Sequence, residues 1–488
     1  MIKLENVSFT YAGENRGGVN NINLNIPKGE FIVLCGESGC GKTTITRLLN
    51  GLIPHFHEGE MSGKVTINGQ SISNQSLYDT ARLVGSVFQN PRSQFFNVDT
   101  TSEIAFGCEN FGLPEHKIQE HMKKTVESFH IGKLLGRSIF HLSGGQKQKI
   151  ACASVSAMEP DIFVMDEPSS NLDISSIMEL RQILALWKKQ GKTIIISEHR
   201  LFYMRGLVDR FLYVRDGKID YEYSAEDFEA LTEKERMTMG LRMYSLKDIQ
   251  LEKRGSPLKK HLELKDFYFA HKNQTETLHI EDCKIPAERV VAIIGNNGAG
   301  KSTFARCFCG LEKKCGKVIC NGKVIKPKDR LNICYTVMQE VNHQLFTESI
   351  SDEIKISMEH DDKNLEKEIL EQLDLFLYRD RHPMSLSGGQ KQRAAIASAI
   401  AANRSILFFD EPTSGLDFKH MKEVAYILRE LQKKGKTVYV ITHDLELIVD
   451  CCTDIIHFEN GRIKDQYPID EKGLLKIQEY FFKEESSI

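Results

Sequence analysis

The stretch "CGESGCGKTT", residues 35–44, is the part of this chain that is most informative about its fold. Residues 36–43 fit the pattern G-x-x-x-x-G-K-[ST], which ends on Lys42 and Thr43. The apolar run "FIVL" precedes the stretch, which leads into the helical pattern "TITRLLNGL". Glycines let backbone N–H groups approach an anion, and the N-terminus of a following helix adds positive potential. A strand, a glycine loop and a helix in this order therefore predict a phosphate-binding loop.

The same loop occurs a second time, as "IGNNGAGKST" at residues 294–303. A longer segment recurs as well: residues 142–173 read "LSGGQKQKIACASVSAMEPDIFVMDEPSSNLD", and residues 386–417 read "LSGGQKQRAAIASAIAANRSILFFDEPTSGLD". Asp410 follows Asp166 by 244 positions (410 − 166), whereas Lys301 follows Lys42 by 259 (301 − 42). Such repeats predict two copies of one domain, and the unequal spacing predicts an insertion after the first loop.

The insertion contains "GLIPHFHEGE" at residues 51–60, where the second copy has only "GLEKKCGKV". His55, His57, Glu58 and Glu60 are all residue types that bind metals. His55 and His57 would share one face of a strand, however, and Glu58 would point away from that face. We interpret the stretch as an inserted loop that distinguishes the two copies.

The 488 residues are too many for one ordinary hydrophobic core. We expect a first domain at residues 1–220, a charged linker at 221–260 and a second domain at 261–488. Gly255, Ser256 and Pro257 are typical of the turn that ends such a linker.

Composition narrows the class of protein further. The formal net charge of −3 and the sequence pI of about 6.6 disfavour a nucleic-acid partner. No apolar run approaches the roughly 20 residues that span a bilayer. The 12 cysteines are scattered without a C-x-x-C pattern, so we expect reduced thiols. We therefore expect a cytoplasmic chain that reaches a membrane only through a partner.

Paired carboxylates follow two apolar runs, in "IFVMDE" (residues 162–167) and "ILFFDE" (residues 406–411). Asp166 and Asp410 suit a position close to Mg²⁺, and Glu167 and Glu411 suit the polarisation of an attacking water. The hydroxyl that ends each phosphate loop can bind the same ion. The expected magnesium-site residues are Thr43, Asp166, Ser302 and Asp410, to which the resemblance to a known family adds Gln89 and Gln339.

The motif "LSGGQ" at residues 142–146 and 386–390 resembles the signature of ATP-binding cassette (ABC) ATPases. The resemblance covers both halves of the chain, and neither half has lost a motif. It implies an α/β fold of two P-loop NTPase cassettes, each with a RecA-like core, an antiparallel β subdomain and an α-helical signature subdomain. It also implies that both cassettes bind and hydrolyse ATP, and that they pair head to tail within one chain.

The resemblance implies two composite ATP sites, each built from one cassette's loop and the other cassette's signature. His199 and His443 would hold the γ-phosphate and the attacking water, and Tyr11 and His271 would stack on adenine. Site one would contain Gly36, Glu37, Ser38, Gly39, Cys40, Gly41, Lys42, Thr43, Thr44, Gln89, Asp166, Glu167 and His199, with Ser387, Gly388, Gly389, Gln390 and Asp417. Site two would contain Gly295, Asn296, Asn297, Gly298, Ala299, Gly300, Lys301, Ser302, Thr303, Gln339, Asp410, Glu411 and His443, with Ser143, Gly144, Gly145, Gln146 and Asp173.

The segments after Gln89 and Gln339 read "QNPRSQFFNVDTTSEIAFGCEN" and "QEVNHQLFTESISDEI". With the inserted loop, they resemble the ATPases of energy-coupling factor (ECF) importers. The resemblance implies a transmembrane coupling subunit, a separate substrate-binding membrane subunit, and a location at the cytoplasmic face of a bacterial or archaeal membrane. The aromatic and apolar residues in these segments would either line a groove for the coupling subunit or belong to the core: Phe95, Phe96, Leu345 and Phe346.

Two other functions stay open at this point. A tandem ATPase of another importer, such as a sugar type, would share the same motifs, although its second cassette is usually degenerate. A soluble tandem ATPase that works on ribosomes or DNA would carry a long charged arm, an iron–sulfur cysteine cluster or a basic excess, and these features are absent from the sequence.

Overall fold

The computed structural model describes residues 1–13, 17–245, 260–270, 276–312 and 315–482. Contacts divide the chain into two compact units, Met1–Lys247 and Asp248–Ile488. The division falls inside the predicted linker, but residues 221–245 fold onto the first unit. They form the end of β10 (Lys218–Ser224), α8 (Ala225–Ala230) and α9 (Glu233–Thr238). Gly255, Ser256 and Pro257 lie outside the described residues.

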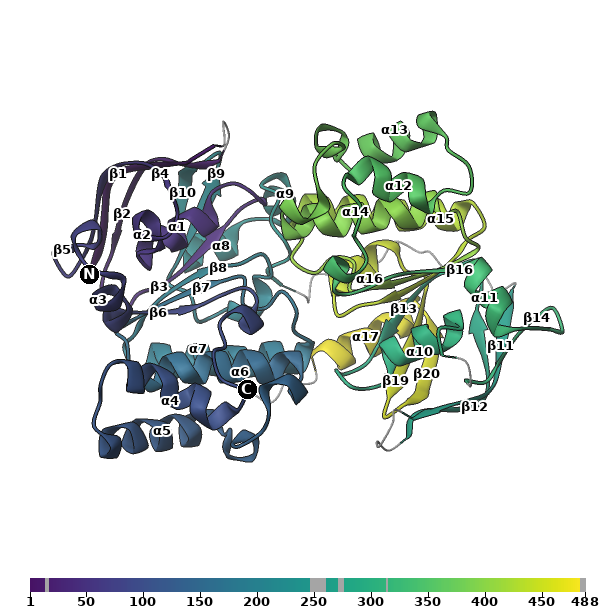
Figure 1. The fold of residues 1–488 in the computed structure, drawn as a ribbon, viewed down its shortest axis with the longest axis horizontal. Helices are drawn as coiled ribbons and strands as arrows, with labels where there is room; N and C mark the ends of the chain where they lie inside the picture. The colour runs from purple at the N-terminus through teal and green to yellow at the C-terminus, as the bar shows by residue number, and fades with distance from the viewer. Residues whose placement is uncertain (14–16, 246–259, 271–275, 313–314, 483–488) are drawn as a thin grey trace. The chain divides into compact units, whose positions relative to one another are not determined.

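The first unit contains two sheets (Figure 1). The smaller sheet is antiparallel, with the strands β2 (Gly18–Ile26), β1 (Ile2–Tyr11), β4 (Gly59–Ile67) and β5 (Gln70–Ser71) in that order. The larger sheet has the order β10, β9 (Arg210–Arg215), β3 (Phe31–Cys35), β8 (Thr193–Ser197), β7 (Ile162–Asp166) and β6 (Val84–Val87). Its strands are parallel except at the β9–β10 hairpin. Parallel strands place their carboxyl ends at one edge, where the motifs lie.

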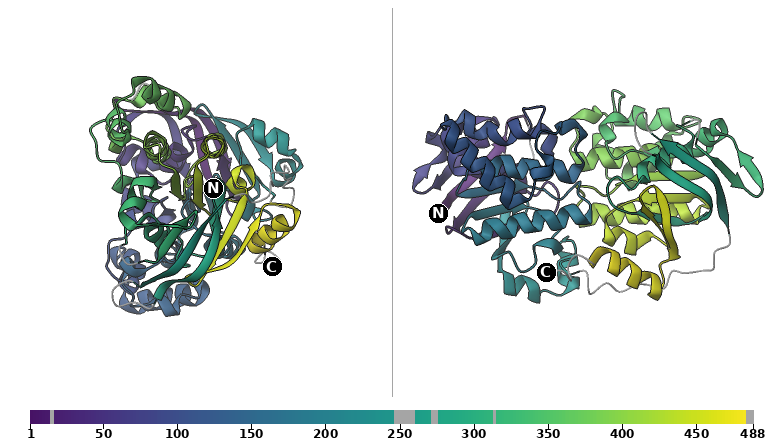
Figure 2. Two further views of the ribbon diagram at one scale, coloured as in Figure 1. Left: turned by 90° about the vertical axis from the view of Figure 1, so that its right-hand side faces the viewer. Right: turned by 90° about the horizontal axis from the view of Figure 1, so that it is seen from below.

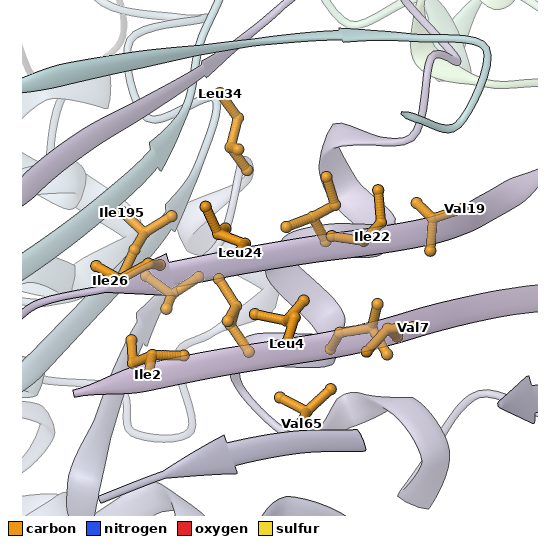
Figure 3. Close-up of a cluster of buried hydrophobic side chains, with 14 of the residues drawn as sticks. Ile2, Leu4, Val7, Val19, Ile22, Leu24, Ile26, Leu34, Val65 and Ile195 are labelled. Atoms are coloured by element: carbon orange, nitrogen blue, oxygen red, sulfur yellow. The ribbon is translucent and has the colours of Figure 1, made fainter. Parts of the chain in front are cut away.

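The hydrophobic core of the first unit joins the two sheets (Figure 3). Alternate residues of β1, including Ile2 and Leu4, point to the same face and are almost completely buried. They pack with Leu24 of β2 and with Leu34 and Ile195 of the larger sheet. The antiparallel sheet is therefore fastened to the layer that carries the phosphate loop.

Helices complete the first unit. Three follow the loop region: α1 (Lys42–Leu49), α2 (Leu52–His55) and α3 (Leu77–Leu83). Four more lie between β6 and β8 in the chain: α4 (Thr100–Asn110), α5 (Glu115–Phe129), α6 (Gly144–Ala157) and α7 (Ile174–Lys189). Helix α6 packs against α4, α5 and α7 (Figure 1). This group is the helical subdomain that the sequence predicts around the signature.

The second unit repeats the plan. Its smaller sheet has the order β12 (Glu276–Pro286), β11 (His261–Ala270), β14 (Lys317–Cys320) and β15 (Lys323–Ile325). Its larger sheet has the order β16 (Cys334–Val337), β17 (Ile406–Asp410), β18 (Thr437–Ile441), β13 (Val290–Ile294), β19 (Asp454–Glu459) and β20 (Arg462–Pro468). Taken from β20 to β16, the larger sheet has the strand order that the first unit has from β10 to β6, so the expected fold is confirmed.

Six helices of the second unit have counterparts in the first: α10 (Lys301–Cys309), α11 (Pro327–Ile333), α12 (Ile350–Ser357), α13 (Lys363–Gln372), α14 (Gly388–Ala401) and α15 (Phe418–Lys433). Two more follow them: α16 (Leu445–Cys451), where the first unit has only a 3-10 turn at Phe202–Met204, and α17 (Glu471–Phe482). The last of these packs on the β19–β20 hairpin, which is coloured yellow in Figure 2, and Lys476 of α17 forms an ion pair with Asp465 of β20 at 2.6 Å. None of the helices in the described ranges is both long and apolar enough to cross a membrane.

Candidate nucleotide-binding and hydrolysis sites

The first phosphate loop wraps around the buried ammonium group of Lys42. Its Nζ donates hydrogen bonds to the carbonyl oxygens of Gly36 and Glu37, each at 2.8 Å. Gly36 has φ of 141°, and a Cβ there would lie 2.2 Å from the carbonyl oxygen of Val214. At Gly39, by contrast, a Cβ would meet no atom of the described residues within 4 Å. The loop is thus closely packed on its protein side and open where an anion would approach.

The second loop has the same plan with one difference. Lys301 Nζ donates to the carbonyl oxygens of Gly295 and Asn296, and it also lies 3.2 Å from Nε2 of His443. In the first unit His199 lies instead near Glu167, with 3.4 Å between Nε2 and Oε1. The corresponding distance from His443 to Glu411 is 3.7 Å. Each predicted histidine therefore lies beside the predicted catalytic glutamate of its own unit.

The hydroxyl and carboxyl groups expected around Mg²⁺ meet in both units. Thr43 Oγ1 donates to Asp166 Oδ1 at 3.2 Å, and Ser302 Oγ donates to Asp410 Oδ2 at 2.7 Å. Burial raises the pKa of Asp166, and the neighbouring Glu167 raises it further. Burial likewise raises the pKa of Asp410. Oxygen donors of this kind fit Mg²⁺, whose charge would offset the cost of a buried carboxylate.

The two predicted catalytic glutamates share an unusual backbone. Glu167 has φ of 43° and Glu411 has φ of 51°, in the left-handed region that non-glycine residues rarely adopt. Each backbone N–H is held at 2.8 Å, by the carbonyl oxygen of Ser197 or of Ile441. Left-handed residues of this kind cost free energy and cluster at functional sites. The motif itself carries no sign of this conformation.

Gln89 completes the first hydrolytic group. Its Nε2 donates to Oε2 of Glu167 at 2.7 Å. Gln339 occupies the equivalent place directly after β16, and its side chain is exposed. The structure thus brings Gln89, Glu167 and His199 together within the first unit.

The signature motifs also act as helix caps. Ser143 is the N-cap of α6, and Ser387 is the N-cap of α14. In each helix the serine hydroxyl accepts a hydrogen bond from the backbone of the glutamine three residues on, Gln146 or Gln390, and that glutamine side chain accepts one from the serine N–H. This is a capping box. The S-x-x-Q spacing would have predicted it, and our reading of the sequence missed it.

The aspartates after each carboxylate pair cap the next helices. Asp173 Oδ1 accepts from the backbone N–H of Ser176 at 2.9 Å, at the start of α7. Asp417 Oδ1 accepts from the backbone N–H of His420 at 2.9 Å, at the start of α15. Both carboxylates are buried. Each therefore has a structural role in its own unit beside any contact with a nucleotide.

Tyr11 lies at the end of β1, close to the first loop. Its hydroxyl accepts a hydrogen bond from Arg47 at 2.9 Å and lies 3.3 Å from Thr44 Oγ1. The ring of His57, in the inserted loop, meets Tyr11 edge-on at 5.8 Å. His55 has a different partner, the carbonyl oxygen of Ile72, at 3.2 Å. His271, the expected counterpart of Tyr11, lies outside the described residues.

The loops that begin at Gln89 and Gln339, the Q-loops, are each held in place by a second glutamine five positions later. Gln94 accepts from the N–H of Phe88 at 3.2 Å and donates to the carbonyl oxygen of Ser86 at 3.1 Å. Gln344 does the same in the second unit, with Met338 and Thr336. These bonds fix the direction in which the chain leaves β6 and β16.

The apolar residues that follow Gln94 and Gln344 include both exposed side chains, as expected for a groove, and buried side chains, as expected for the core. Phe96 is 77% exposed and Phe346 is 72% exposed, whereas Leu345 is 1% exposed and Phe95 is half-buried. Phe96 stacks on Phe106 of α4, with 5.0 Å between the ring centroids. One large aromatic side chain of each unit is thus on the surface beside the Q-loop.

Two phosphate loops, each with a carboxylate pair and a histidine at the same sheet edge, define a tandem P-loop ATPase. The family model of the ABC transporter matches residues 19–170 and 278–414. The chain therefore belongs to the ABC transporter family of ATP-binding proteins, and it is an ATPase.

Relatives span almost the whole chain. A protein of Treponema denticola that carries the name ABC transporter ATP-binding protein is 44% identical over 485 residues, which are 98% of this chain and 99% of the relative. A Methanosarcina mazei protein of the same name is 31% identical and covers 95% of this chain and 88% of its own length. Among solved structures, the ribosome-bound archaeal Pelota and ABCE1 model matches with a TM-score of 0.72 at 22% identity, over 97% of this chain and 80% of that chain, which shows the fold.

Proposed function

We propose that the chain is the ATP-binding and hydrolysing subunit of an importer of the ECF type. It would couple ATP hydrolysis to the uptake of a small nutrient, such as a vitamin, a vitamin precursor or a metal ion. A transmembrane coupling subunit and a separate substrate-binding membrane subunit would complete the complex at the cytoplasmic face of a bacterial or archaeal membrane. The main support for this proposal is an exposed phenylalanine in each unit, Phe96 or Phe346, two residues after the glutamine that holds the Q-loop in place.

Both units keep a full set of hydrolytic groups, which supports two active sites. Lys42 and Lys301 would neutralise the β and γ oxygens of ATP, and Glu167 and Glu411 would polarise the attacking water. His199 and His443 lie beside these glutamates and would hold the γ-phosphate. When bound, Mg²⁺ would spread the negative charge of the phosphates. The residues that would hold it are Thr43, Gln89, Asp166, Ser302, Gln339 and Asp410.

The signature helices would close over the phosphates bound by the other cassette. Ser143 and Gly144 are exposed at the N-terminus of α6, and Ser387 and Gly388 are exposed at the N-terminus of α14. Each of these helices has 14 residues, so its N-terminus has the positive potential that favours an anion. We propose that the two cassettes pair head to tail within one chain, with Asp173 and Asp417 beside the opposite site.

The surface beside Phe96 would receive a helix of the coupling subunit. Val98 and Phe140 are also exposed, and the carbonyl oxygen of Val98 accepts a hydrogen bond from Ile139 N–H at 2.9 Å, which brings the two segments together. An apolar patch of this kind on a soluble domain is typical of a protein contact site. The amphipathic face of a coupling helix would cover these side chains.

Sedimentation with native membranes tests the proposal. We expect the wild-type chain, co-expressed with its membrane subunits, to sediment with the membranes. The Phe96→Glu/Phe346→Glu variant should stay in the supernatant, because a charged side chain cannot enter an apolar contact without losing its hydration. Phe56→Glu is the matched control, since Phe56 is 71% exposed but lies in the inserted loop. The proposal is wrong if the wild-type chain stays soluble or if the double variant sediments equally well.

Purification of the wild-type complex in mild detergent tests the ECF type. Two different membrane polypeptides should accompany the chain, one of them a small substrate-binding protein. A complex with a pair of equivalent channel subunits and no such protein would favour another class of importer.

A further inference from the structure

A wholly buried carboxylate stands directly before His199. Glu198 accepts hydrogen bonds from the backbone N–H groups of His199 at 3.0 Å and Arg200 at 3.1 Å. It also accepts from Ser169, through the hydroxyl at 2.9 Å and the backbone N–H at 3.3 Å. The hydroxyl of Tyr203 is a further donor, at 3.2 Å. Burying a carboxylate is costly unless it is fully hydrogen-bonded, and these donors satisfy that requirement.

Arg200, directly after the histidine, contacts the same segment from the other side. Its guanidinium donates to the carbonyl oxygen of Ser169 at 3.4 Å and to that of Leu172 at 3.3 Å. Arg200 is itself buried. The two charged residues that flank His199 therefore both bind the chain segment between Glu167 and Asp173.

The second unit joins the equivalent elements with a different arrangement of residues. The position of Glu198 is occupied by Thr442, and the position of Arg200 is occupied by Asp444. Asp444 Oδ2 accepts a hydrogen bond from Thr413 Oγ1 at 2.7 Å, and Thr413 is the counterpart of Ser169. A buried carboxylate thus anchors the same hydroxyl position in both units, once from before the histidine and once from after it.

We propose that Glu198 and Arg200 are positioning residues that hold His199 and the segment 167–173 together as one rigid element. The inference rests on the proposed hydrolytic roles of Glu167 and His199. In this arrangement a shift of the histidine is transmitted to Glu167 at one end of the segment and to Asp173 at its other end. The second unit achieves the same coupling with a single carboxylate, Asp444.

The observations favour positioning over general stabilisation of the core. A residue that only filled space would not need to bind the segment through polar groups on both sides of the histidine. Glu198 could equally have been capped by local N–H groups alone, yet two of its five bonds come from Ser169, 29 positions earlier in the chain. Small displacements of catalytic groups are enough to slow a reaction by about 100-fold.

Steady-state ATP hydrolysis by the full chain tests the proposal. We expect Glu198→Thr to lower kcat by about tenfold or more, because the two paired cassettes would close and open together and a slow first site would delay the whole cycle. KM for ATP should stay within about twofold, because Lys42 and its loop bind the phosphates separately. The double variant Glu198→Thr/Arg200→Asp reproduces the arrangement of the second unit. We expect it to restore kcat to at least about a third of the wild-type value, because the carboxylate introduced at position 200 can accept from Ser169 as Asp444 does from Thr413.

Tyr203→Phe is the matched control, because it removes one donor to Glu198 and leaves the bonds to Ser169 and His199 in place. Its kcat should stay within about twofold of the wild-type value. A Glu198→Thr variant that folds and keeps the wild-type kcat overturns the inference, and so does a double variant that remains as slow as the single one. If Glu198→Thr does not fold, the double variant is compared with the wild type alone. A rate near that of the wild type then supports the proposal, whereas an inactive or unfolded double variant overturns it.

Glu167→Gln, measured in the same series, separates this inference from the proposed function. If Glu167→Gln hydrolyses ATP at the wild-type rate, the proposed catalytic role of Glu167 is wrong. If Glu167→Gln is inactive and Glu198→Thr is fully active, only the positioning role fails.

Discussion

Thr43 Oγ1 donates a hydrogen bond to Asp166 Oδ1 at 3.2 Å, although 123 positions separate the two residues in the chain. Strands β3 and β7 are not neighbours in the sheet, since β8 lies between them. Their carboxyl ends nevertheless reach the same edge, so the loop after β3 and the end of β7 meet there. Ser302 and Asp410 repeat the contact at 2.7 Å.

Replacement of the two glutamates should stop hydrolysis. We expect Glu167→Gln and Glu411→Gln each to lower the ATPase rate by about 100-fold or more, because the amide cannot polarise water as a carboxylate does and because the two paired cassettes would close and open together. ATP binding, measured by equilibrium titration, should be retained in both variants. A double variant that hydrolysed ATP at the wild-type rate would refute the assigned roles.

Asp166→Asn should stabilise the protein while it inactivates the first site. Burial and Glu167 raise the pKa of Asp166, so the folded protein binds a proton there at a higher pH than the unfolded chain does. The stability of the wild-type protein therefore falls as pH rises from the ordinary aspartate value through the raised one. Without metal or nucleotide, we expect Tm of the variant to exceed that of the wild type by a margin that grows with pH.

The pH dependence of stability should have the opposite sign for Asp99→Asn. Hydrogen bonds from Ser102 lower the pKa of Asp99, which caps α4, so its contribution to stability is present at neutral pH and is lost in acid. Melting curves between about pH 2 and pH 7, a window that extends to both sides of the ordinary carboxyl pKa of about 4, would compare the two variants. If the difference in Tm between variant and wild type changed with pH in the same way for Asp166→Asn and Asp99→Asn, the opposite directions of the two pKa shifts would be contradicted.

The two signature glycines should differ in their tolerance of a methyl group. At Gly145 a Cβ would lie 1.9 Å from Ser176 Oγ and 2.6 Å from its Cβ, in the contact between α6 and α7. At Gly389 the closest atom would be Leu416 Cδ2 at 3.1 Å. We expect Gly145→Ala to destabilise the protein by about 1–3 kcal/mol in chemical denaturation, because the helices must separate. Gly389→Ala should cost less than about 1 kcal/mol, since the leucine side chain can turn away. An equal loss in both variants would argue against this packing.

Cysteine crosslinking tests the pairing of the cassettes. Ser38 lies in the first phosphate loop, and Gly388 lies at the exposed start of α14, where a Cβ meets no described atom within 4 Å. We expect Ser38→Cys and Gly388→Cys to crosslink within one chain when ATP is bound, as seen by a mobility change of the monomer on a denaturing gel. Crosslinks found only between chains would refute intramolecular pairing.

Much of the fold could be predicted because each motif is local. The loop of Lys42 follows an apolar strand and opens a helix, and this order is visible within about 20 residues. The repeat of Lys301, Ser387 and Asp410 then predicts a second copy of the fold. The boundary of the first domain was harder to place. Residues 221–245 are charged and resemble a linker, yet Phe228 and Tyr244 bury their rings against Phe211.

Residue types at short spacing predict the chemistry of this protein: two phosphate loops, two carboxylate pairs and two signatures. Which of these groups touch depends on the tertiary structure. The side chain of Gln89 contacts Glu167, and Glu167 has a left-handed backbone. A buried carboxylate binds the segment after each catalytic glutamate: Glu198, before the histidine, in the first unit, and Asp444, after the histidine, in the second. Phe346 is exposed, whereas the adjacent Leu345 is buried. Periodicity in a sequence records local burial, whereas contacts across many tens of residues depend on the order of strands in a sheet and on the direction of each loop that leaves it.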